Sequence, residues 1–218
     1  MTRKRIDGVE TRQKLLAAAA RVFAAKGYHD TRVMDICKLA GANVASVNYY
    51  FDGKAELYAE AWRDAFNKSI ATYPPDGGIP LSASAEERLR GQILALIQRI
   101  MDPDSLDFDI VHREMANPTG LLSEVMRRSI EPLRQRLTAV VRDLLGKGAT
   151  ERQIQLCEMS IHSQCFGPLM HERHRHNGPK EHKGPGPFPR GITCSVMVDH
   201  IFRFSLAGIS EVRKSSKS

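Results

Sequence analysis

The sequence predicts an all-α protein. Apolar residues recur at intervals of three and four along most of the chain, the spacing that places side chains on one face of a helix. Glycine and proline signals, at Gly27, Gly41 and the segment 74–79, separate these periodic stretches. No alternating pattern typical of β-strands and no internal repeat accompanies them.

The composition limits the class of protein. The chain has 218 residues, 42% of them hydrophobic, which is enough for one or two packed domains. No apolar run approaches the ~20 residues that span a bilayer. The early run "LLAAAA" is short and is interrupted by Arg21, unlike a signal peptide. We therefore expect a cytoplasmic protein without a membrane partner. Its four cysteines show no C-x-x-C pair and are expected to be reduced.

Positive charge gathers at the N-terminal end. Residues 1–54 hold ten Lys or Arg and five Asp or Glu, while the remainder holds 22 and 20, out of a net charge of +7. A basic segment favours phosphate backbones. Charge that serves only solubility is the alternative.

Three helices are expected in this basic segment. The first covers residues 7–25 and ends at Gly27. The second opens after Thr31, a plausible N-cap, and ends at Gly41. The third is short, 45–51, and precedes the turn at 52–53. A helix, a tight turn and a second short helix form the helix-turn-helix plan.

The short third helix is the expected reader of DNA. In a helix-turn-helix the second helix lies in the major groove, where an Asn amide pairs with adenine and Val44 reaches a thymine methyl. Tyr49, Tyr50 and Lys54 are suited to phosphates. A surface helix with polar decoration is the competing interpretation. The candidate DNA contacts are Arg32, Asn43, Val44, Ala45, Ser46, Asn48, Tyr49, Tyr50 and Lys54.

The rest of the chain also reads as helical. A helix from Lys54 precedes the break at 74–79, and Ser84 with Glu87 forms a capping box for the next helix. Further helices are expected at 107–117, at 119–148 with a kink or break at Pro132, at 150–176 with a perturbation at 167–168, and at 192–213. Segment 177–191 is expected to be a loop, and 214–218 a disordered tail.

Residues 9–58 resemble the DNA-binding domain of the TetR family of bacterial repressors. The matching features are Thr31, Ile36-Cys37, Ala40-Gly41, Tyr49-Tyr50-Phe51, Lys54 and Glu56-Leu57. Cys37 stands where the family usually has Ala, and Asn48 where Tyr is common; "ANVASVNYYF" is similar to the CecR-type subgroup. The resemblance implies a helix-turn-helix DNA-binding domain, 1–54, and a helical domain, 55–218, that binds an effector and dimerises.

The resemblance also implies a ligand-responsive repressor. It would bind a palindromic double-stranded DNA operator as a homodimer and leave it when a small-molecule effector binds. Apolar stripes on the last two long helices suit such a dimer; packing of both stripes inside one subunit is the alternative. They comprise Ile154, Cys157, Ile161, Val198, Ile201, Phe202, Ser205 and Ile209.

The effector pocket is predicted from adaptable apolar and aromatic residues of the central helices, which suit ordinary cores equally well. Arg113 and Glu114 are expected to pair with each other. The pocket candidates are Met101, Phe108, His112, Met115, Met126 and Phe166.

Two alternatives remain at this stage. "HERHRH", 171–176, brings three histidines together, which would suit a metal-responsive regulator, although two arginines oppose it and no H-E-x-x-H motif is present. A helical adaptor that does not bind DNA is the other. No nucleophile elbow, P-loop or dinucleotide fingerprint occurs, so we expect neither enzyme activity nor a cofactor nor a metal.

Overall fold

A computed structural model of the chain describes residues 3–177 and 193–215, with side chains from 8 to 167 and from 193 to 215. These residues form α-helices joined by loops, and no strand occurs among them. The all-α prediction is confirmed. Two compact units are present, one of residues 1–71 and 104–130, the other of residues 72–103 and 131–218.

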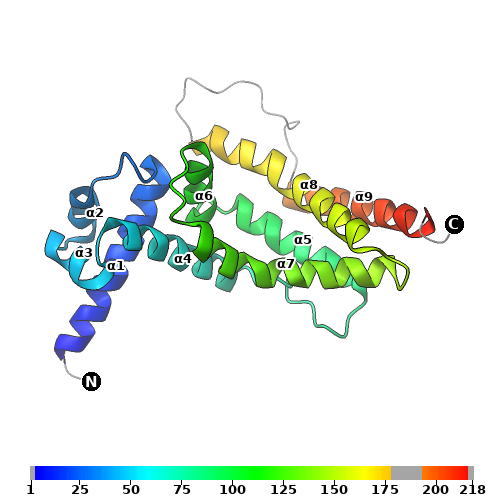
Figure 1. Cartoon of the computed structure of the whole chain (residues 1–218), viewed down its shortest axis with the longest axis horizontal. Helices are drawn as coiled ribbons and strands as arrows, with labels where there is room; N and C mark the ends of the chain where they lie inside the picture. Colours follow the sequence, from blue (N-terminus) through cyan, green and yellow to red (C-terminus); the bar gives the residue numbers. More distant parts are fainter. Residues whose placement is uncertain (1–2, 178–192, 216–218) are drawn as a thin grey trace. The chain divides into compact units, whose positions relative to one another are not determined.

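The first unit is built on the N-terminal helices (Figure 1). Its helices are α1 (Arg3–Lys26), α2 (Val33–Ala40), α3 (Val44–Phe51), α4 (Lys54–Thr72), α6 (Leu106–Ala116) and the first part of α7 (Ser123–Leu145). Helix α1 packs against both α2 and α6. The apolar positions that recur at three and four residues form the core, with Leu16, Phe23, Ile36, Leu57 and Trp62 all buried.

The second unit packs long helices around α5 (Figure 1). Its helices are α5 (Ala85–Met101), the remainder of α7, α8 (Glu151–Asn177) and α9 (Cys194–Ser215). The predicted capping box at the start of α5 is present, because Glu87 N donates to Ser84 Oγ and Ser84 N donates to Glu87 Oε2. Helix α5 contacts α8 and α9, which also contact each other.

Two predicted irregularities do not interrupt their helices. Helix α7 passes through Pro132 from Ser123 to Leu145, and α8 passes through 167–168. A proline removes one N–H donor, but the turns on either side keep their own hydrogen bonds, so the helix continues. The predicted loop at 177–191 lies outside the described residues except for Asn177, which ends α8. The predicted tail begins at Lys214, but Lys214 and Ser215 belong to α9, and the rest of the tail lies outside the described residues.

The apolar stripes of α8 and α9 pack inside their own unit. All of the predicted dimer stripe except Phe202 is at most 8% exposed, with Ser205 among the buried residues. A side chain already buried in one chain has no surface left for a second copy, so the intrasubunit alternative is correct for these residues.

The predicted domain boundary at residue 54 divides the chain by function, into a DNA-binding and an effector-binding domain, and stays a prediction. The two compact units divide the chain by packing instead, at other residues. Among the described residues, no helix has the length and apolar character needed to cross a membrane. The four cysteines form no disulfide in the structure.

Candidate nucleic-acid interface

The two ends of helix α2 are capped differently. Its C-cap Gly41 adopts the left-handed conformation with φ 63°, and its N–H reaches the carbonyls of the last turn. The predicted N-cap at Thr31 is wrong, because Arg32 occupies that position without a side-chain cap. Thr31 is buried, and its hydroxyl donates to Gly27 O at 2.6 Å. It therefore fastens the turn between α1 and α2.

Helix α3 begins at an Asn cap. Asn43 has an extended backbone, and its Oδ1 accepts from Ala45 N at 2.9 Å. This bond satisfies one of the free N–H groups that open every helix. The side-chain carbonyl oxygen of Asn43, a predicted base contact, is thus engaged within the protein. Sequence analysis missed this capping role, although Asn is a favoured N-cap.

The two faces of α3 differ in burial. Val47 and Phe51 are buried and anchor the helix, whereas Tyr49 is 82% exposed and Val44 is also exposed. Most of the predicted DNA contacts share the outer face, as expected for a recognition helix. The exposed candidates are Arg32, Asn43, Val44, Ala45, Asn48 and Tyr49; Ser46, Tyr50 and Lys54 are half-buried.

Tyr50 braces α3 against α1. A β-carbon added at Gly8 would lie 3.2 Å from the Tyr50 hydroxyl oxygen, a tight contact that would require the Tyr50 side chain to shift by a few tenths of an ångström. The Tyr49 ring meets the Tyr50 ring edge to face at 4.8 Å between centroids. Tyr50 thus has a packing role besides any phosphate contact.

Two basic residues of the N-terminal segment, Arg12 and Lys54, already have partners in the first unit. Arg12 Nη2 lies 2.7 Å from Glu60 Oε2, and the Arg12 guanidinium sits 5.1 Å above the Phe51 ring. Lys54 Nζ sits 4.3 Å above the Tyr28 ring, and burial lowers the pKa of Lys54, with Asp30 opposing that shift. The side chains of Arg3, Lys4 and Arg5 lie outside the described residues.

Arg113 and Glu114 do not form the predicted pair. Glu114 accepts from Tyr58 Oη at 3.0 Å, and burial, then the Glu114 carboxylate, raises the pKa of Tyr58. Glu114 also accepts from the backbone N–H groups of Thr119 and Gly120. Arg113 Nε instead donates to Ala24 O on α1 at 3.4 Å.

The six pocket candidates differ in exposure. Phe108 is buried, His112, Met126 and Phe166 are half-buried, and Met101 and Met115 are exposed. Four belong to the first unit, while Met101 and Phe166 belong to the second. Their grouping into one effector pocket stays a prediction.

The histidines of "HERHRH" have side chains outside the described residues. Among the described residues, no group of three or more His, Cys, Asp or Glu is arranged to hold a metal ion. The metal-responsive interpretation gains no support from them.

Comparison with known proteins decides the family. Residues 15–61 match the model of the TetR family of bacterial regulatory proteins. Residues 85–209, more than half of the chain, match the C-terminal domain of the HTH-type transcriptional dual regulator CecR. The chain belongs to the TetR family. The resemblance found in the sequence is therefore confirmed, including its CecR-type character.

Relatives of this TetR-family protein are transcriptional regulators. It is 27% identical over 143 residues to SrpR of Pseudomonas putida, covering 65% of this chain and 64% of SrpR. It is 25% identical over 161 residues to CecR of Shigella flexneri, covering 69% of this chain and 72% of CecR. A structure solved from Pseudomonas aeruginosa PAO1 shares the fold, with a TM-score of 0.73, 19% identity, and 94% and 92% of the two chains covered.

The alignment with several relatives spans less than two thirds of their length. The family establishes a transcriptional regulator with a helix-turn-helix domain, in preference to an adaptor that does not bind DNA.

Proposed function

We propose that this TetR-family regulator is a repressor that binds a palindromic operator as a homodimer and is released by a small-molecule effector. The observation that carries the proposal is the outer face of α3, which presents Val44, Asn48 and Tyr49 while Val47 and Phe51 anchor the helix.

The DNA contacts follow from the chemistry of that face. Asn48 offers one donor and one acceptor to an adenine edge, and Val44 offers a methyl surface to thymine. Tyr49 and Lys54 are placed in phosphate-binding roles that set the register of the helix on DNA. Asn43 is assigned to the cap of α3.

The homodimer is assigned to the outer faces of α8 and α9. A cleft of about 380 Å³ between these helices is lined by Leu156, Phe204 and Gly208 among others. Leu156 and Phe204 are exposed, as are Met159 on α8 and Val196 on α9. A second copy would cover these apolar side chains, and its two-fold symmetry would require a near-palindromic operator.

Effector release requires the effector to favour one arrangement of the dimer. Allosteric coupling is typically about 1–3 kcal/mol, which changes operator affinity roughly 5–150-fold.

The test is footprinting of the intergenic DNA beside the gene of this protein. We expect a protected near-palindrome with two half-sites about one helical turn apart or a multiple of it. Uniform, salt-sensitive binding with no protected site would overturn the operator proposal. An operator whose occupation requires an added compound would overturn release by an effector.

A further inference from the structure

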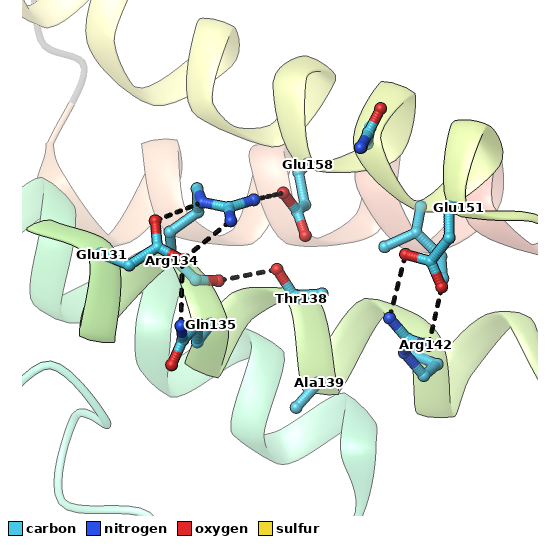
Figure 2. Close-up of a pocket in the computed structure, with 10 residues that line it drawn as sticks. Glu131, Arg134, Gln135, Thr138, Ala139, Arg142, Glu151 and Glu158 are labelled. Carbon is cyan, nitrogen blue, oxygen red and sulfur yellow. Dashed lines mark hydrogen bonds and ion pairs between the residues drawn. The ribbon is translucent and has the colours of Figure 1, made fainter. Parts of the chain in front are cut away.

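A polar cleft of about 410 Å³ lies between α7 and α8 in the second unit (Figure 2). Helix α7 supplies Arg134, Thr138 and Arg142, and α8 supplies Glu151, Glu158 and the apolar Ile154. Its volume falls within the ~300–1,000 Å³ of ordinary small-molecule sites.

Both arginines of the cleft already have glutamate partners. Arg134 donates to both carboxylate oxygens of Glu131, each at 2.9 Å. Arg142 reaches the two oxygens of Glu151 at 2.8 and 3.1 Å. Two guanidinium groups are thereby matched by two carboxylates.

Glu158 is the additional carboxylate. It is only 6% exposed, and Figure 2 shows it descending from α8 toward α7. Its Oε2 lies 3.8 Å from Arg134 Nη1, too far for a hydrogen bond. Its Oε1 is buried and has no hydrogen-bond partner.

An unpartnered carboxylate oxygen is costly in such a place. Burial removes the water that would solvate it, and the long contact with Arg134 replaces little of that solvation. A retained buried carboxylate in a cleft of ligand size therefore calls for a donor from outside the chain. Among the charged lining groups, three carboxylates face two guanidinium groups, so the donor that completes the balance is a cation.

We propose that this cleft binds an organic cation whose N–H group donates to the Glu158 carboxylate, with its apolar part against Ala139. Binding to the cleft stands on the geometry alone. Only its identification as the effector site rests on the proposed repressor function.

The probe is benzamidine, a flat cation with N–H donors, compared with benzamide, its neutral counterpart. Binding to the full-length protein without DNA is measured by isothermal titration calorimetry. The wild type is expected to bind benzamidine more tightly than benzamide, by roughly tenfold or more, the effect of a hydrogen bond to a buried charge.

Glu158→Gln is expected to lose that preference while keeping the shape of the side chain. Glu211→Gln is the matched control, because it makes the same change of charge at an exposed carboxylate of the same unit that does not line the cleft. This control variant should keep most of the preference. Circular dichroism and sedimentation establish that both variants fold and assemble like the wild type.

Three results would overturn the proposal. The first is a wild type that does not prefer benzamidine to benzamide. The second is an equal loss of preference in both variants, which would indicate a diffuse charge effect. The third is a Glu158→Gln protein that becomes monomeric, which would mean that a second copy supplies the missing donor.

The function is tested separately. Specific benzamidine binding that leaves operator affinity unchanged would keep the cation site and reject its role as the effector site. A protein that binds no operator at all would reject the repressor proposal without affecting the calorimetry.

Discussion

Replacing Asn43 tests whether this residue caps α3 or reads a base. Its Oδ1 accepts from Ala45 N at 2.9 Å at the start of a helix of only eight residues. An N-cap is worth about 1 kcal/mol, and a helix this short has little stability of its own. Asn43→Ala should therefore speed amide hydrogen exchange in the first turn of α3 about fivefold, the equivalent of about 1 kcal/mol.

Asn43→Ser separates the two roles, because serine also caps a helix but lacks the amide that pairs with a base. Exchange measured by NMR should stay near the wild-type rate in Asn43→Ser, and gel-shift assays should show operator affinity close to wild type. Unchanged exchange in Asn43→Ala would refute the cap. Wild-type rates of amide hydrogen exchange, together with an equal loss of operator affinity in both variants, would show that the side-chain amide of Asn43 contacts DNA.

Three further predictions concern DNA binding and assembly. Asn48→Ala should cost about 1–3 kcal/mol at one base pair per half-site; equal weakening across a panel of single-base operator variants would argue against base reading. Lys54→Ala should reduce the slope of log affinity against log salt by about 0.9 per lost phosphate contact. An unchanged slope would leave Lys54 only its contact with the Tyr28 ring. Phe204→Glu should give a folded monomer in sedimentation, because Phe204 is 64% exposed and its loss opens no cavity in the unit; a folded variant that remains dimeric would place the interface elsewhere.

The sequence alone determined the helices and the recognition motif. Helical periodicity and turn chemistry are local properties, so Gly41 and the Ser84 capping box could be predicted from neighbouring residues. The same locality predicted Asn48 and Tyr49 as candidate DNA contacts, and both side chains are exposed.

Only the tertiary structure decided which partner each side chain has. Periodicity shows that α8 and α9 carry apolar stripes, but not whether a stripe meets its own chain or a second copy; Ile161 and Ile201 are covered within the unit. The sequence shows no evident partner for Arg12, but in the structure α4 places Glu60 beside it. Glu158 reads as an ordinary surface glutamate until α7 and α8 bury it without a hydrogen-bond partner for Oε1. These partners lie far apart along the chain or on separate helices, so their meeting depends on packing that no local pattern encodes.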